Sequence, residues 1–306
     1  MATEGITHRT VPVNGINMHV AEKGEGPTIV GLAARGYRAV APDLRGFGDT
    51  DAQPSVEAYS IFHLVGDLVA LIDALGQEQL CIAGVRRGAR LGAIVAWHLC
   101  LFRPDRVKAL VNISVAFSPR KPNAKPVETL RSIYGDEHYI ARFQFSGTRR
   151  SREVVCETRN GICAQEALRV SDTWSVLLDG GVIGSPDHQV PLPPWLSEED
   201  IRYFADKFEQ SGFTGGINYY RSLDRNWELS APWTGAQVKV PTKFIVGDLD
   251  LSYHTPGVQN FIHKGGLKKF VPLLEEVVVM EGVGHFLNQE KPSETTDHIF
   301  DFIKNF

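Results

Sequence analysis

The sequence predicts an α/β protein in which a mostly parallel sheet carries helices on both faces. Predicted strands and helices alternate between residues 79 and 115, and predicted strands return after residue 241. This alternation is typical of parallel sheets with crossover helices. A chain of 306 residues with 43% hydrophobic and 22% charged residues also has the composition of an ordinary globular protein with a sizeable core.

The chain opens with a predicted β-hairpin. Residues 11–20 alternate apolar and polar side chains around Asn14-Gly15. An Asn-Gly pair between two alternating runs is the strongest short hairpin signal. Two short apolar runs, 28–30 and 37–41, follow and are expected to be buried strands.

An amphipathic helix is predicted over residues 63–76, where leucine, valine and isoleucine recur at helical spacing and Gly76 provides a stop. Residues 79–84 then predict a strand, 92–102 a helix and 108–115 another strand. Later in the chain, strands are expected at 243–246 and 276–280, and a last helix at about 293–303.

Between residues 118 and 233 the pattern changes to helical and irregular stretches, including an acidic helix start at residues 197–200. We interpret this region as an inserted, mainly helical cap. The sequence thus predicts a core formed by residues 1–117 and 234–306 with a cap formed by residues 118–233.

Composition excludes several function classes. The formal net charge is -4, and lysine and arginine are scattered rather than gathered in a basic stripe, so we expect no nucleic-acid partner. The first ten residues are polar and no apolar run is long enough to cross a bilayer, which predicts a cytoplasmic protein without a membrane span. The four cysteines show no CxxC pairing and are expected to be reduced thiols.

Two titratable groups follow the late strands. Asp250 lies in the loop after residues 243–246, and His285 lies in the loop after residues 276–280. Because ligands and reactive groups gather at the carboxyl ends of the strands in open α/β sheets, these loops are the expected site. Taken singly, Asp250 would be interpreted as a turn cap and His285 as a structural loop histidine. Together they form a base with an acid to orient it.

The segments around these residues resemble the plant-type soluble epoxide hydrolases, which have the α/β-hydrolase fold with a helical cap. The resemblance covers most of the chain and rests on residues 41–46, 96–104, 136–140, 206–210, 218–221, 241–247, 253–254, 271–279 and 284–286. It implies that the core is an α/β-hydrolase fold.

In that family an aspartate attacks an epoxide carbon to give an alkyl-enzyme ester, two cap tyrosines hold and protonate the ring oxygen, and a His-Asp pair activates water. Carried over by position, Asp250 is the orienting acid, His285 is the water-activating base, and Tyr139 and Tyr220 are the acid pair. A tyrosine hydroxyl can donate to the ring oxygen without carrying charge. Either tyrosine alone would be interpreted as a packing residue of the cap. The resemblance implies lipophilic epoxides, fatty-acid epoxides included, as substrates, and no metal or cofactor.

One departure from the family lies after Val30. The two predicted strands on either side of it should be parallel neighbours, yet only Gly31 to Gly36 join them. A parallel crossover needs about a dozen residues or more. The family has a His-Gly-Phe-Pro turn there, which supplies an oxyanion-hole amide, followed by a helix. The sequence therefore predicts that one strand-helix connection has been deleted.

The second departure concerns the nucleophile. The family sequence VFVVAHDWGA corresponds to residues 84–93, and matching from Gly92-Ala93 places Arg90 where the aspartate should be. A guanidinium cannot attack an epoxide carbon. We therefore expect the chain as written to form no ester. A reading-frame slip would explain the change, because codons GGT GTT CGT CGT GGC GCA CGA CTG GGG for residues 84–92 encode VFVVAHDW when read from the second base.

Three alternatives remain at this stage. A haloalkane dehalogenase is disfavoured by the tyrosine pair, and an esterase is disfavoured by the absence of a Gly-x-Ser-x-Gly elbow. A catalytically dead protein that binds a lipophilic ligand is the alternative from another class. The sequence leaves open the natural substrate and whether the protein is a monomer or a homodimer.

Overall fold

The computed structural model of the protein describes residues 5–30, 36–84, 91–136, 138–144 and 192–306. Within these residues eight strands form one sheet in the order β1-β2-β4-β3-β5-β6-β7-β8. The strands are β1 (Thr7–Val13), β2 (Ile16–Lys23), β3 (Thr28–Val30), β4 (Arg38–Pro42), β5 (Leu80–Gly84), β6 (Val107–Ile113), β7 (Thr242–Gly247) and β8 (Leu274–Met280). Strands β3 to β8 are parallel, and β2 is antiparallel to both of its neighbours. The predicted α/β class and mostly parallel sheet are confirmed.

The N-terminal hairpin forms as predicted. Asn14 and Gly15 join β1 to β2 with φ angles of 46° and 78°. Two successive positive φ angles give a turn whose twist matches that of the paired strands. The side chain of Glu22 on β2 then bonds Arg9 on β1 and Arg38 on β4, and so connects three neighbouring strands.

Strands β3 and β4 are parallel neighbours, as the sequence predicted. Their register pairs Ile29 with Ala39 and Val30 with Val40. Residues 31–35, which hold most of the short connection between them, lie outside the described residues.

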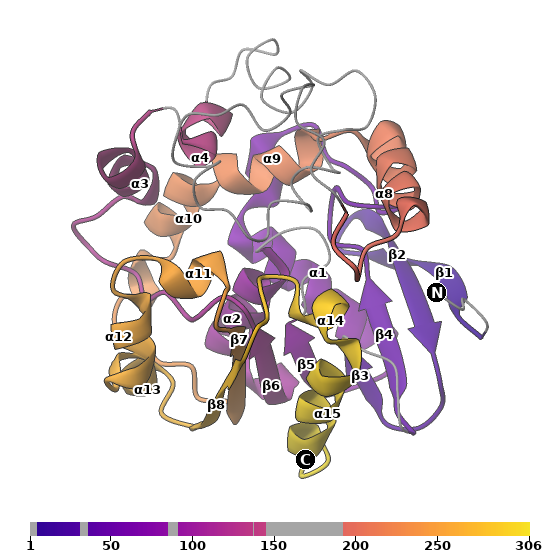
Figure 1. Cartoon of the computed structure of the whole chain (residues 1–306). Coiled ribbons are helices and arrows are strands. Elements are labelled where there is room, and N and C mark those ends of the chain that lie inside the picture. Colours follow the sequence, from indigo (N-terminus) through magenta and orange to yellow (C-terminus); the bar gives the residue numbers. More distant parts are fainter. Residues whose placement is uncertain (1–4, 31–35, 85–90, 137, 145–191) are drawn as a thin grey trace.

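The helices on the two faces and at the far edge of the sheet are α1 (Ile61–Ala74), α2 (Leu91–Phe102), α11 (Leu251–His254), α12 (Val258–His263), α13 (Gly266–Phe270), α14 (Leu287–Glu290) and α15 (Pro292–Ile303). Side chains of β5 alternate between the faces. Leu80 and Ile82 join the larger buried cluster with α1 and α2, whereas Cys81 and Ala83 join a smaller cluster with α15. Figure 1 shows α15 on the opposite side of the sheet from α1 and α2.

A second group of helices lies beyond the sheet, at the top of Figure 1. Its members are α3 (Pro126–Tyr134), α4 (Tyr139–Phe143), α8 (Glu198–Ser211), α9 (Thr214–Arg221) and α10 (Leu223–Leu229). Helix α8 starts at the acidic segment that predicted it, where Ser197 and Asp200 cap each other's backbone amides. No helix among the described residues is both long enough and apolar enough to cross a membrane.

Candidate active site

Asp250 lies at the end of the β7 strand, where it is the N-cap of the short helix α11. The amide of Ser252 donates to its Oδ1 atom at 2.7 Å, and the side chain is fully buried. Just before it, Gly247 lies so close to the next loop that a Cβ would overlap the carbonyl oxygen of Val283. Only glycine allows the two loops to approach this closely, so the sequence at Gly247 brings the acid and the histidine loops together.

His285 follows β8 in a loop held by the carboxylate of Glu290. The amides of Gly284 and Phe286 donate to the two oxygens of Glu290 at 2.6 and 2.8 Å. Backbone bonds on both sides of the histidine restrict where its ring can lie. The ring of Phe286 packs 5.5 Å from the ring of Trp195, which precedes α8.

The structure brings His285 and Asp250 together as the sequence predicted. The Nδ1 atom of His285 lies 2.6 Å from Oδ1 of Asp250, and both side chains are buried. With Nδ1 used toward the carboxylate, the Nε2 atom is the nitrogen that can accept a proton from water. This geometry is that of a base oriented by an acid.

Ser114 is a third member of the cluster that sequence reasoning missed. It follows β6, and its Oγ lies 2.5 Å from Oδ2 of Asp250 and 2.6 Å from Nδ1 of His285. Its φ angle of 72° is left-handed, an uncommon conformation for a residue other than glycine. Its position in the sequence could have indicated this, because Ser114 is a polar residue directly after a buried strand. It therefore lies at the same edge of the sheet as the two loops.

The two helices that carry the predicted tyrosines lie side by side. The Nε2 atom of Gln144, just after α4, donates to the carbonyl of Tyr220 at 2.9 Å, and Nε of Arg221 donates to the carbonyl of Phe143 at 2.9 Å. The rings of Phe143 and Tyr220 are 5.4 Å apart. The backbone of Tyr139 starts α4, but its side chain lies outside the described residues, so the position of its hydroxyl stays a prediction.

Arg90 also lies outside the described residues, which include the end of β5 at Gly84 and the start of α2 at Leu91. Residues 85–90 between these elements read Val-Arg-Arg-Gly-Ala-Arg. This segment contains no carboxylate, hydroxyl or thiol side chain.

Among the described residues, one cluster has side chains of the types and spacing that can bind a metal ion. Side-chain atoms of His19, Asp43 and Asp49 lie within 4.8 Å of one another. They already have partners, because His19 bonds Asp43 at 2.7 Å and the Nζ of Lys207 bonds Asp49 at 2.7 Å. Asp250 and His285 are not part of this group.

Comparisons with known proteins agree with this architecture. The family model of the alpha/beta hydrolase fold matches residues 15–146. Epoxide hydrolase 1 of Siraitia grosvenorii is 50% identical over 99% of this chain and 100% of its own length. The crystal structure of an epoxide hydrolase from Vigna radiata has a TM-score of 0.89 and 48% identity, with both chains fully covered. Potato (Solanum tuberosum) epoxide hydrolase I has a TM-score of 0.88 and 51% identity over 98% of this chain and 100% of the potato chain.

Proposed function

Because the chain belongs to the plant-type epoxide hydrolases of the α/β-hydrolase fold, we propose that its intact form converts lipophilic epoxides to vicinal diols. The substrates would include fatty-acid epoxides. The observation that carries the proposal is the buried pair of His285 and Asp250, joined at 2.6 Å at the carboxyl ends of β7 and β8. Such a pair is what hydrolysis of an ester intermediate requires.

The proposed reaction has two steps. An aspartate carboxylate oxygen bonds to one epoxide carbon, the C–O bond of the ring breaks, and the freed oxygen takes a proton from Tyr139 or Tyr220. Nε2 of His285 then takes a proton from water while the water oxygen attacks the ester carbonyl. The ester C–O bond breaks, the leaving diol oxygen takes the proton from His285, and the proton of the new carboxylic acid returns to the deprotonated tyrosine, which restores the carboxylate and the acid pair. Asp250 orients His285 and stabilises its protonated form.

We also propose that residues 118–233 are a cap that covers this site, with α4 and α9 carrying the acid pair over the sheet edge. Support comes from the contacts between α4 and α9 and from the packing of Trp195 on Phe286, next to His285. A cytoplasmic location and a reaction without metal or cofactor remain predictions from the sequence.

The chain as written lacks the nucleophile in this proposal. Counting back from Gly92-Ala93 places Arg90 at its position, and counting forward from the end of β5 at Gly84 brings Arg86 close to it. Either count ends on an arginine, which cannot form the ester. We therefore infer that the sequence as written is inactive in this step and that an aspartate stands here in the intact form.

The test compares the chain as written with a repaired chain, which carries VFVVAHDWG at residues 84–92 and a family-like block after Val30. Diol formation is measured with a lipophilic test epoxide, and formation of the ester is measured by intact mass. Turnover by the repaired chain alone supports the proposal. Turnover by the chain as written contradicts the missing nucleophile, and no turnover by a folded repaired chain contradicts epoxide hydrolysis.

An esterase mechanism with Ser114 as nucleophile is disfavoured by geometry. In a serine triad the hydroxyl meets one ring nitrogen and the acid meets the other. Here Ser114 and Asp250 both lie beside Nδ1 of His285. Ser114 is therefore placed to hold the acid and not to be activated by the base. If the repaired chain binds a lipophilic epoxide without turning it over, the catalytically dead binding protein becomes the better account.

A further inference from the structure

Helix α9 is fixed to the core along one face. Gly215, Tyr219 and Ser222 are spaced four and three residues apart, so they share one side of the helix, and all three are buried. Gly215 lies against Gly46 in the loop after β4, where a Cβ on Gly215 would be 2.7 Å from the Cα of Gly46. Ser222 donates from Oγ to the carbonyl of Val56 at 3.0 Å.

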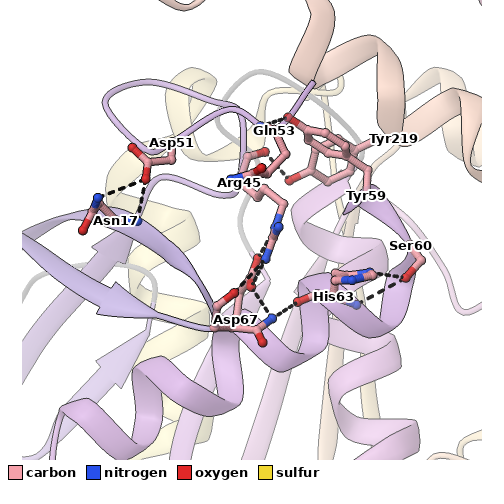
Figure 2. Close-up of polar contacts among 10 residues, drawn as sticks. Asn17, Arg45, Asp51, Gln53, Tyr59, Ser60, His63, Asp67 and Tyr219 are labelled. Carbon is pink, nitrogen blue, oxygen red and sulfur yellow. Dashed lines mark hydrogen bonds and ion pairs between the residues drawn. The ribbon is translucent and has the colours of Figure 1, made fainter. Parts of the chain in front are cut away.

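Tyr219 forms a hydrogen bond between the buried face of α9 and the core. Its hydroxyl donates to the carbonyl of Arg45 at 2.9 Å, and its ring packs 5.3 Å from Phe47 and 5.5 Å from Tyr59. Burial raises the pKa of Tyr219 well above its ordinary value, so the hydroxyl stays protonated and remains a donor. Figure 2 shows this hydroxyl directed at the backbone of Arg45.

The acceptor of that bond is itself held rigidly. Arg45 forms two hydrogen bonds with Asp67 of α1, from Nε at 2.9 Å and from Nη2 at 2.6 Å, and both side chains are buried. Asn14 of the hairpin turn donates to the same carboxylate at 2.7 Å. A paired buried guanidinium with a planar fork fixes the position of its own backbone. The loop under α9 is therefore tied to both α1 and the hairpin.

We propose that Tyr219 and Gly215 are positioning residues that set the rotation and the height of α9 and thereby hold the hydroxyl of Tyr220 in place. Successive residues of an α-helix point about 100° apart, so a helix fixed at Tyr219 directs Tyr220 to one adjacent side. That side faces α4, where the ring of Tyr220 meets Phe143 at 5.4 Å. The inference rests on the proposed role of Tyr220 as an acid toward the substrate oxygen.

Four variants of the full chain test it in two matched pairs. Tyr219→Phe deletes the hydroxyl that bonds Arg45, and Tyr203→Phe deletes an exposed hydroxyl on α8. Gly215→Ala forces α9 away from Gly46, whereas Gly216→Ala meets only the ring of Phe47, at 3.2 Å. Alanine raises helix propensity equally in the two glycine variants, so a difference between them reports the contact with the core.

The first measurement is hydrogen-deuterium exchange of the α9 amides, which does not depend on the proposed function. We expect Tyr219→Phe and Gly215→Ala to speed exchange in α9, and the two controls to leave it unchanged. Unchanged exchange in both Tyr219→Phe and Gly215→Ala would overturn the inference.

The second measurement is the Kd of N-cyclohexylhexanamide, a neutral probe whose carbonyl oxygen accepts a hydrogen bond as the epoxide oxygen would. We expect Tyr220→Phe and Tyr219→Phe each to weaken binding about tenfold, the value of one hydrogen bond. In the Tyr220→Phe background the effect of Tyr219→Phe should vanish, because Tyr219 acts through Tyr220.

The outcomes separate the two proposals. If Tyr220→Phe weakens binding but Tyr219→Phe and Gly215→Ala do not, or if the effect of Tyr219→Phe persists in the Tyr220→Phe background, the positioning role is wrong and the proposed function stands. If the repaired chain binds no probe, or if Tyr220→Phe leaves its Kd unchanged, the acid role in the proposed function is wrong and the positioning claim falls with it.

Discussion

The loops after β7 and β8 differ sharply in sequence from the connection between β5 and α2, although all three follow parallel strands of one sheet. The first two loops hold Asp250 and His285 in a buried hydrogen-bonded pair. The connection after β5, residues 85–90, contains three arginines and no carboxylate, hydroxyl or thiol side chain. The pair is held by contacts from Ser252, Glu290 and Gly247 in its own half of the chain and from Ser114 after β6. These contacts come from other parts of the chain than residues 85–90.

The largest effect is expected from removing the base in the repaired chain. His285→Ala should lower diol formation about 100-fold or more, because the proposed base that takes a proton from water is removed. The ester should still form, so the intact mass should rise by the mass of the epoxide and stay raised. The chain as written should show no such mass, with or without His285. If His285→Ala releases diol at the parent rate, His285 is not the base that hydrolyses the ester.

The next effect concerns how this fold accommodates a buried arginine. Arg45 is buried with a paired carboxylate, so Asp67→Ala should cost about 3–5 kcal/mol by leaving the guanidinium unpaired. Glu228→Ala, which breaks the exposed pair with Lys125, should cost far less, because solvent screens that pair. Urea unfolding of both variants measures the difference. A small loss for Asp67→Ala would mean that Arg45 is tolerated in this core without its ion pair.

A smaller effect is expected at Ser114, which connects β6 to the acid. In the repaired chain, Ser114→Ala and Ser114→Gly should each slow ester hydrolysis about tenfold, because Asp250 loses one hydrogen bond. Glycine adopts the φ of 72° freely and alanine does not, so Ser114→Gly should unfold at a higher urea concentration than Ser114→Ala. Single-turnover rates together with urea midpoints separate the hydrogen bond from the backbone. Equal rates in all three proteins would show that Ser252 and His285 hold Asp250 without the serine.

The smallest effect is a pH dependence at Glu22, which connects β1, β2 and β4 in the first half of the chain. Burial alone would raise the pKa of Glu22, but the hydrogen bonds from Arg38 and Arg9 outweigh it and lower the pKa below 4.5. The stabilising contribution is therefore present above pH 4.5 and is lost as the pH falls through the lowered value. Glu22→Gln should cost about 1 kcal/mol or less at pH 7, because its partners Arg9 and Arg38 are partly exposed and water screens the pairs.

Thermal unfolding of the parent and Glu22→Gln between pH 7 and pH 3 measures this dependence. The two Tm values should converge at the acidic end. If the difference between the two Tm values is the same at every pH, the charge of Glu22 does not stabilise the contacts among β1, β2 and β4.

Much of the fold could be predicted because its signals are local. The Asn14-Gly15 turn, the helical spacing that produced α1, and the strand-helix alternation from β5 to β6 are each encoded within a short window, and each forms where it was expected. The parallel pairing of β3 with β4 also followed from two short apolar runs. A deletion after Val30 was predicted because a parallel crossover has a minimum length, and it stays a prediction because residues 31–35 lie outside the described residues.

The sequence by itself determined the sheet, the two loops that hold Asp250 and His285, and the lack of a nucleophilic side chain in residues 85–90, since residue type alone decides whether a group can attack. Only the tertiary structure decided that Ser114 joins that pair and that Tyr219 bonds the backbone of Arg45. Residues 114 and 250, and likewise 45 and 219, are far apart in the chain. Their contacts depend on how strands, loops and α9 pack in three dimensions, and short sequence patterns do not predict that packing.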